Sequence, residues 1–184
     1  MNGFSRRTFL MGAGALVAAC GNPVGSNRAA EIDARVDAAL DYMYGAIPET
    51  VELARNASGM LVMPLVTRAG LLTFGGAYGE GALRIGGATV DYYSQAQGSV
   101  GLQLGAQQSA HTLFFMTPEA LADFRASDGW EVGGDIEYVV RREGGRVGAT
   151  STTMLRPVIG VVYGQAGLLM GVKLEGTKYT RILR

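Results

Sequence analysis

The sequence predicts a single α+β domain dominated by antiparallel β-structure, either barrel-like or a sandwich, with two N-terminal helices and one short inserted helix. From residue 59 onward, short apolar runs alternate with glycine or proline breaks, which is typical of many short strands at regular spacing. Apolar residues at helical spacing precede this region, and one strong helix start interrupts it. Residues 28–184 suit one domain of ordinary size, and the sequence indicates no second one.

The first 19 residues have the pattern of a twin-arginine export signal. The paired Arg6 and Arg7, with Phe9 and Leu10 close behind, precede a short apolar run that ends at Ala19. The alternative is a membrane-spanning helix, which needs ~20 apolar residues, about twice the length of this run. We therefore expect a cleaved signal peptide.

Cys20 is the only cysteine and follows the small residues Ala18 and Ala19. Small residues before a cysteine fit the peptidase that processes lipoproteins, and a lone cysteine in an exported protein suggests a special role. We expect lipidation of Cys20, with a buried free thiol as the alternative. A diacylglyceryl group would then hold the protein stably on a membrane, since one acyl chain is marginal and two are sufficient.

These features predict three segments of the chain and the location of the protein in the cell. Residues 1–19 are the predicted signal peptide, residues 20–27 a lipidated flexible tether and residues 28–184 the domain. The expected place is a bacterial cell envelope, on the periplasmic side. Gly21 favours the outer membrane, because Asp at this position retains enterobacterial lipoproteins in the inner membrane.

Three helices follow from spacing and capping signals. Ile32, Val36, Leu40 and Met43 recur at helical spacing, and Asn27 is a candidate cap. A second short helix is predicted to open at Pro48-Glu49 and to continue through Asn56. Thr117-Pro118-Glu119 predicts a third helix that runs to about Arg125, with Thr as cap and Pro at the first position.

The strands are predicted from apolar runs and their breaks. Pro64 and Gly75-Gly76 are expected to end the first two runs, and Gly86-Gly87 has the pattern of a hairpin turn. Further turns are expected at residues 143–146 and 164–167, and residues 99–116 are either one bent strand or two. The other predicted strands are residues 60–63, 71–74, 82–85, 89–93, 131–142, 158–163, 168–174 and 178–183.

Charge and glycine content exclude several classes of protein. The 16 basic and 16 acidic residues balance, and removal of Arg6 and Arg7 leaves a slight acidic excess, which is unlike a nucleic-acid-binding domain. The 28 glycines are about twice the average share, without the three-residue period of collagen.

Residues 75–81 superficially resemble a nucleotide loop but lack Gly-Lys-Ser/Thr and a following helix. We expect a glycine-rich turn between strands there.

The sequence offers no convincing catalytic or metal site. His111 is the only histidine, so metal sites built from His and Cys are excluded, and Ser109 is poorly placed as its nucleophilic partner. We expect His111 to be structural or on the surface. Carboxylates along the first helix are expected to form a solvated face, and a strand group is left open as a catalytic pair: Asp33, Asp37 and Asp41 in the helix, and Glu131, Asp135 and Glu137 in the strand. No enzyme activity and no cofactor are expected.

Two loose groups of basic residues are candidates for contact with anionic lipid. Each cation near such a surface contributes ~1 kcal/mol. Ordinary surface charge is the alternative for both groups. Tyrosines at several strand positions could line a pocket or a membrane interface, or simply be core and cross-strand pairs. The basic candidates are Arg141, Arg142 and Arg146 around one turn, and Lys173, Lys178, Arg181 and Arg184 near the C-terminus.

The order of the glycine motifs resembles the SYLF lipid-binding domain. Gly59-Met-Leu-Val-Met-Pro64 and the glycine-rich residues 75–83 are similar to the opening of that domain. The resemblance covers residues 29–184 and places this chain with the bacterial twin-arginine-exported lipoproteins of the family. Its other parts are the central glycine-rich strand at residues 98–107, the short helix at 117–124, and the motifs at 127–133 and 167–176.

The resemblance implies a single β-rich domain that binds lipids and has no known catalytic residues. Eukaryotic members bind membrane phosphoinositides through a basic amphipathic helix, and some fungal members bind actin filaments. Here the matching helix is acidic, with Glu31 and three aspartates against Arg28 and Arg35. The family therefore predicts the fold better than the ligand.

The expected function is a membrane-anchored, non-catalytic lipid-binding lipoprotein of the bacterial cell envelope. Its expected partners are membrane lipids, including anionic phospholipids, and no nucleic acid. The alternative is a structural or adaptor lipoprotein that binds a protein partner and uses lipid only as a tether.

Overall fold

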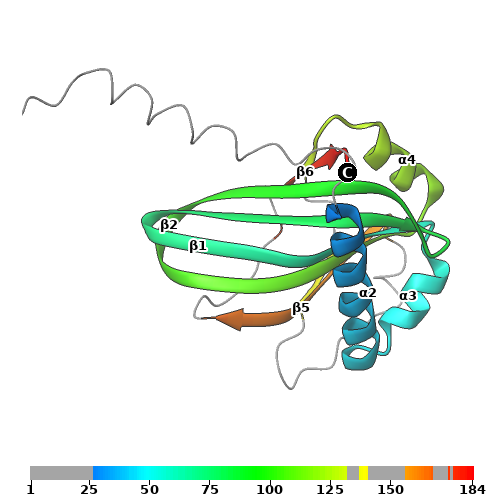
Figure 1. Cartoon of the computed structure of the whole chain (residues 1–184), viewed down its shortest axis with the longest axis horizontal. Coiled ribbons are helices and arrows are strands. Elements are labelled where there is room, and N and C mark those ends of the chain that lie inside the picture. The colour runs from blue at the N-terminus through cyan, green and yellow to red at the C-terminus, as the bar shows by residue number, and fades with distance from the viewer. Residues whose placement is uncertain (1–26, 132–136, 141–155, 168–173, 175) are drawn as a thin grey trace, which may run out of the picture.

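A very long hairpin forms the centre of the fold (Figure 1). In the computed structural model, which describes residues 27–131, 137–140, 156–167, 174 and 176–184, β1 (Gly59–Ile85) pairs with β2 (Ala88–Phe115) along its whole length. The predicted turn at Gly86-Gly87 is confirmed. Both glycines have positive φ, 58° and 85°, as a two-residue hairpin turn of the favoured type requires.

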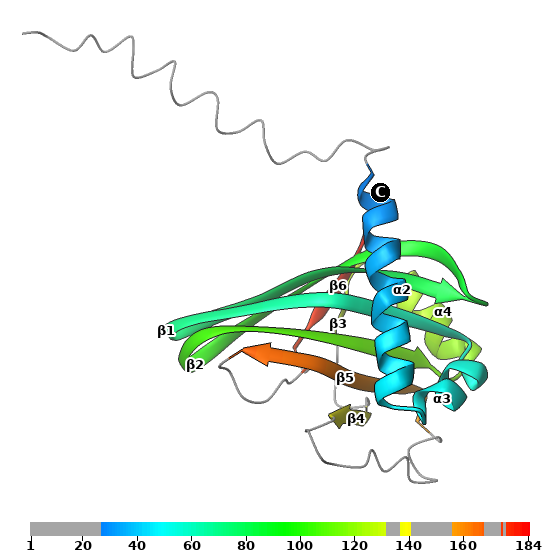
Figure 2. The same cartoon turned by 60° about the horizontal axis from the view of Figure 1, so that its bottom comes forward.

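The hairpin folds back on itself at the end opposite the helices (Figures 1 and 2). A Cβ added at Gly79 would lie 2.6 Å from the Leu65 carbonyl oxygen, and one at Gly81 would overlap the Val62 carbonyl oxygen. The first and last parts of β1 are therefore in contact. We call residues 69–78 of β1 and their partners 96–106 of β2 the folded-back end.

The short strands and the glycine-rich turn predicted within residues 60–85 were wrong, because they are parts of one 27-residue strand. Pro64 does not end a strand but lies in a bulge between Met63 and Val66, where β1 has its free edge. The glycines of residues 75–81 allow close approach of backbone instead of making a turn. Residues 99–116 were expected to form one bent strand or two, and the first option is confirmed because residues 99–115 are the second part of β2.

The remaining strands extend this hairpin into a curled, half-barrel sheet of order β3-β6-β2-β5-β4, with β1 on β2. β5 (Val158–Gly167) and β6 (Lys178–Ile182) pair with opposite ends of β2, and β4 (Glu137–Val140) runs parallel to β5. β3 (Trp130–Glu131) pairs with β6. The predicted antiparallel α+β domain is confirmed, apart from the parallel β4–β5 pair.

The structure differs from the predictions for β5 and for the strand at residues 131–142. The turn expected at residues 164–167 was wrong, because β5 continues through it and Gly164, with φ of 60°, lies in a bulge. The strand predicted at 131–142 is present at β3 and β4. Its remaining residues, the turn at 143–146 and most of the strand at 168–174 lie outside the described residues.

All three predicted helices are present. α2 (Arg28–Ala46) and α3 (Thr50–Asn56) precede the hairpin, and α4 (Pro118–Ala126) follows it. Thr117 Oγ1 accepts a hydrogen bond of 3.2 Å from the Ala120 amide, as the capping signal predicted. Asn27 precedes α2, but its side chain makes no capping bond, so that prediction was wrong.

The helices cover the two faces of the sheet. α2 and α3 lie across one face (Figure 2), where Met43, Ile47 and Leu53 pack on Phe114 and Ile159. α4 packs on the other face through Leu121 and Phe124, against a cluster that includes Leu61, Met63, Leu113, Phe115, Trp130 and Tyr179. Burial of such side chains contributes ~1.5–3 kcal/mol each, so the sheet is stabilised from both sides near its helix-covered half.

Candidate functional site

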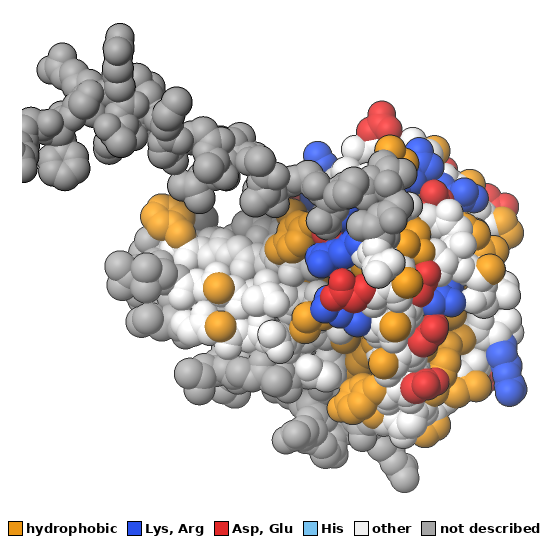
Figure 3. Space-filling view, viewed as in Figure 1, with side chains coloured by type: hydrophobic (Ala, Val, Ile, Leu, Met, Phe, Trp, Pro, Cys, Tyr) orange, Lys and Arg blue, Asp and Glu red, His pale blue; other side chains and the backbone are white. Residues whose placement is uncertain are grey.

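Charged side chains gather over the helix-covered half of the molecule (Figure 3). The same view shows hydrophobic side chains beside the C-terminal half of α2. Tyr42 of α2 and Leu65 of β1 are both exposed, at 57% and 37%. An exposed tyrosine and leucine next to a hollow are a reason to look for a binding site at this place.

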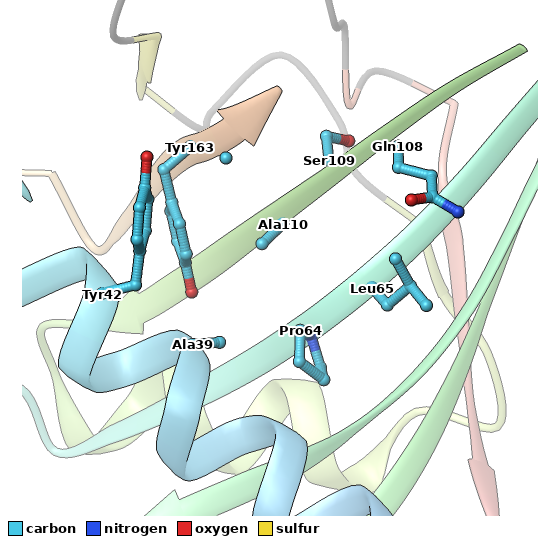
Figure 4. A pocket seen from close by; sticks show the side chains of 9 residues that line it. Ala39, Tyr42, Pro64, Leu65, Gln108, Ser109, Ala110 and Tyr163 are labelled. Carbon is cyan, nitrogen blue, oxygen red and sulfur yellow. The ribbon is translucent and has the colours of Figure 1, made fainter. Parts of the chain in front are cut away.

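The hollow is a groove of about 230 Å³ where α2 crosses β1, β2 and β5 (Figure 4). Tyr42 and Tyr163 stand side by side at one end, and Pro64 and Leu65 come from β1. We call this the α2 groove. Its lining residues are Ala39, Tyr42, Pro64, Leu65, Gln108, Ser109, Ala110, Tyr163 and Gly164.

Two bulges explain why the helix does not close this groove. Pro64 and Leu65 form the bulge of β1, and Gly164 lies in the bulge of β5. The β1 bulge lies opposite Ala110 and the β5 bulge opposite Ser109, and these two neighbours on β2 are both buried. Because bulges bend a strand locally, the sheet turns away from α2 at this level and leaves space beneath the helix.

The two tyrosines at one end of the α2 groove differ in burial: Tyr163 is buried, whereas Tyr42 is exposed. The Tyr163 hydroxyl lies 3.0 Å from Thr112 Oγ1, and burial raises the pKa of Tyr163 to about 12. The ring of Tyr42 stacks on that of Tyr163, with 6.3 Å between centroids and 24° between planes. A buried neutral phenol and an exposed ring therefore form an aromatic wall that suits an apolar ligand.

The lining of the α2 groove contains no ionised side chain. No carboxylate, lysine, arginine or histidine lines it, and the described residues contain no cluster of three His, Cys, Asp or Glu that could hold a metal. Its polar groups are Gln108, Ser109 and the phenols. Such a site can hold an apolar group and orient it by a few hydrogen bonds.

His111 lies close to Ser109 in sequence but belongs to a separate buried contact. Its Nε2 lies 2.7 Å from the Tyr179 hydroxyl oxygen, and the ring is fully buried. Burial, with the charge of Arg68, lowers the pKa of His111 to about 3. The histidine is therefore neutral and structural, one of the two roles expected of it.

The carboxylates of α2 were expected to form a solvated face, but two of them attach the helix to the hairpin. Asp33 accepts 2.7 Å hydrogen bonds from Thr89 Oγ1 and the Tyr92 hydroxyl. Asp37 pairs with Arg84 at 2.7 Å. The expectation of a solvated face was wrong for Asp33, because the hairpin turn brings matching donors under the helix, whereas the Asp37 side chain remains 62% exposed.

A second polar cluster joins the start of α2 to the C-terminus. Glu80 accepts hydrogen bonds from Arg28 Nε at 3.1 Å, Arg184 Nη2 at 2.7 Å and the Tyr78 hydroxyl at 2.9 Å. Burial alone would raise the pKa of Glu80, but these bonds outweigh burial and lower it. Arg184, counted with the basic candidates, is thus used inside the domain.

The other basic candidates within the described residues, Lys178 and Arg181, do not line the α2 groove. Lys178 and Arg181 are exposed on β6. Arg181 Nη1 lies 3.8 Å from Asp91 Oδ1, and the other carboxylate oxygen of Asp91 pairs with Arg125 at 3.2 Å. The structure therefore gives Arg181 an acidic neighbour. The lipidation residue, the export arginines and the remaining basic candidates lie outside the described residues: Cys20, Arg6, Arg7, Arg141, Arg142, Arg146 and Lys173.

Comparison with known families supports the resemblance seen in the sequence. Residues 96–181 match the family model Ysc84, whose description is "Las17-binding protein actin regulator". This part of the chain, somewhat less than half of it, is therefore similar to a Ysc84 (SYLF) domain. The match includes the β2 and β5 sides of the α2 groove, and a domain of this kind is consistent with lipid binding. No curated protein sequence matches the chain.

The groove residues were not found from the sequence. Tyr42 and Leu65 carry no motif, and only the sheet register and the two bulges bring them together with Tyr163. Tyr163 is one of the strand tyrosines that were expected either to line a pocket or to pack in the core, and it lines this groove. Within the described part of the chain, no helix is long and apolar enough to cross a membrane.

Proposed function

We propose that this protein is a non-catalytic lipid-binding lipoprotein of the bacterial cell envelope, whose SYLF domain contacts acyl chains directly. The α2 groove is the observation that carries this proposal. It is open to solvent, lined mainly by apolar and aromatic groups, and bounded by the exposed side chains of Tyr42 and Leu65. Burial of one methylene there would contribute ~0.8 kcal/mol.

The size of the groove limits what it holds. Its volume of about 230 Å³ is below the ~300–1,000 Å³ of sites that enclose a drug-sized ligand. We therefore propose that the α2 groove takes part of one acyl chain while the rest of the lipid stays in its bilayer. Weak binding of this kind is sufficient for a domain that is already held at a membrane.

The attachment to the membrane is assigned to Cys20. We propose that the twin-arginine signal exports the chain, that residues 1–19 are removed and that acyl chains on Cys20 hold the domain on the periplasmic side, with the outer membrane favoured. The sequence pattern supports these steps. The contact through the domain would then add to an anchor that already exists.

The absence of catalysis is part of the same proposal. It is supported by the lining of the α2 groove, which contains no acid–base group in reach of Ser109, and by the neutral His111 engaged with Tyr179. A nucleophile without a base would remain inactive.

A second candidate function is an adaptor that binds a protein partner. The description of the matching family, which names Las17 binding and actin regulation, favours this alternative. In that case the groove would take an apolar side chain of the partner. The lipid on Cys20 would serve only as a tether.

Vesicle sedimentation of residues 21–184, which lack Cys20, separates the two functions. We expect pelleting with phosphatidylglycerol and cardiolipin vesicles, and a several-fold loss of binding in Leu65→Asp. Val90→Asp is the matched control, since Val90 is also an exposed apolar strand residue, at 42%, but lies outside the groove. If the unsubstituted domain fails to pellet at low salt, the lipid-binding proposal is wrong and the adaptor alternative is favoured.

A further inference from the structure

The folded-back end of the hairpin has no charged residue in either strand. Phe74 and Tyr78 are 71% and 53% exposed there. In Figure 3, those parts of this end that are not drawn in grey have the colours of hydrophobic and uncharged groups, and the described charges lie elsewhere. Ala69, Gly76, Ala96 and Ala106 are also exposed. A surface of this kind is unusual on a soluble domain and indicates contact with a partner or a membrane.

Charge and aromatic positions indicate a bilayer as that partner. In β1 the uncharged stretch is bounded by Arg68, which donates a 2.6 Å hydrogen bond to Gln97, and by Glu80, which is bound by Arg28 and Arg184. Tyr78, next to this boundary, directs its hydroxyl to Glu80. An aromatic ring with one apolar side and one polar end is typical of the level where hydrocarbon meets headgroups.

The backbone pairing limits the depth of contact. At residues 97–106, β2 pairs with β1 on one side, and no described strand pairs with its other side. Any backbone group that has no strand partner needs water or headgroups, so full entry of a strand edge into hydrocarbon would be costly. Insertion to a depth of ~5–10 Å, which is typical of interfacial segments, leaves such backbone groups solvated.

The predicted anchor can reach the same membrane. Arg28 Nε lies 3.1 Å from Glu80 Oε2, so α2 begins beside residue 80 of β1. From residue 80 to Phe74 is six residues of strand, or ~20 Å. From Cys20 to Arg28 is eight residues, which span at most ~26–29 Å. Acyl chains on Cys20 and the ring of Phe74 can therefore enter one bilayer surface together.

We propose that the folded-back end is a membrane-contacting tip, with Phe74 as its inserted anchor and Tyr78 at the headgroup level. This inference rests on the proposed lipid-binding function but assigns the bilayer contact to a separate surface from the α2 groove. The tip holds the domain on the membrane surface, and the groove receives an acyl chain.

Tryptophan fluorescence at the tip tests this proposal in the full chain carrying Cys20→Ser. The native Trp130 is replaced by Phe, which keeps its aromatic packing, and Phe74→Trp supplies the probe. On phosphatidylglycerol vesicles we expect a blue shift and quenching by lipids brominated near the headgroup end of the chain. Val90→Trp in the same background is the control, since it lies outside the folded-back end, and should show neither.

A second variant gives an independent readout. Phe74→Asp should weaken vesicle binding at least tenfold, and it should fold normally because residue 74 is exposed. If vesicles pellet the protein but leave the Phe74→Trp emission as it is in buffer, the tip proposal is wrong and the lipid-binding function stands. If the Cys20→Ser chain does not pellet at all, the proposed function fails and the tip with it.

Discussion

Two glycines of β1 are required by close packing rather than by turn geometry. Gly79 and Gly81 lie against the backbone of residues 62–65, and this contact lets one strand return along itself. A side chain at either position would separate the two parts of β1. Gly81 is the stricter of the two, because an added Cβ there also meets Met63 Sδ at 2.6 Å.

We therefore expect Gly81→Ala to lower the free energy of unfolding by about 2–3 kcal/mol, the cost of overpacking a buried site. Gly98→Ala is the control, because an added Cβ at Gly98 meets nothing within 4 Å. Urea denaturation of both variants measures the difference. Equal stability of the two variants would contradict the fold-back contact.

Glu80 makes a pH-dependent contribution to the stability of the folded protein. Its hydrogen bonds lower the pKa of the carboxyl below the ordinary value of 4.5 in the folded protein. A carboxyl whose pKa is lower in the folded than in the unfolded protein stabilises the fold at pH values above its unfolded pKa. This stabilisation is lost as the pH falls through the pKa of the folded protein. Glu80→Gln should cost about 1–2 kcal/mol at pH 7.

The same substitution should cost progressively less as the pH falls below 4.5. Denaturation of wild type and Glu80→Gln at pH 7 and pH 3 tests this. A difference in stability that grows toward pH 3 would contradict the assigned role of Glu80.

At the scale of elements, α2 is attached to the hairpin by both polar and apolar contacts. Ile32 and Val36 pack on Val62 and Ala82, while Asp33 binds the hairpin beyond them. Burial and the hydrogen bond from Tyr92 to Asp33 raise the pKa of Tyr92 to about 12. The helix position, and with it the shape of the α2 groove, depends on this attachment.

A double-mutant cycle measures the attachment. Asp33→Ala and Tyr92→Phe should each destabilise the domain, with a coupling free energy of about 1–2 kcal/mol because the bond involves a charged acceptor. Asp41→Ala combined with Tyr92→Phe is the control, since Asp41 is exposed further along the same helix. Additive effects in the first cycle would contradict the assigned contact.

The helices could be predicted because their signals are local. The spacing of Ile32 to Met43 and the Thr117-Pro118 cap determine α2 and α4 without help from distant residues. The strand predictions failed where glycine was interpreted as the end of a strand. Gly79 and Gly81 serve a contact between residues far apart in sequence, and no local pattern distinguishes that from a turn. The bulges that open the α2 groove depend on register and were likewise out of reach.

At the scale of the whole molecule, charged and uncharged surfaces are separated. The ion pairs of Glu80, Asp33, Asp37 and Asp91 join helices and strands in the helix-covered half. The folded-back end carries no charge, and the α2 groove has no charged residue in its lining. For Arg181 and Arg184, which already have acidic neighbours, this arrangement favours apolar contact with lipid over the predicted basic contact, whereas the basic group at residues 141–146 lies outside the described residues.

The salt dependence of vesicle binding tests this account most directly. Residues 21–184 are mixed with phosphatidylglycerol and cardiolipin vesicles and sedimented at low salt and at 1 M salt, where the screening length falls to ~3 Å. Contact through Phe74 and the α2 groove predicts that most of the binding persists at high salt. Binding that is absent at low salt, or lost entirely at high salt, would contradict the account.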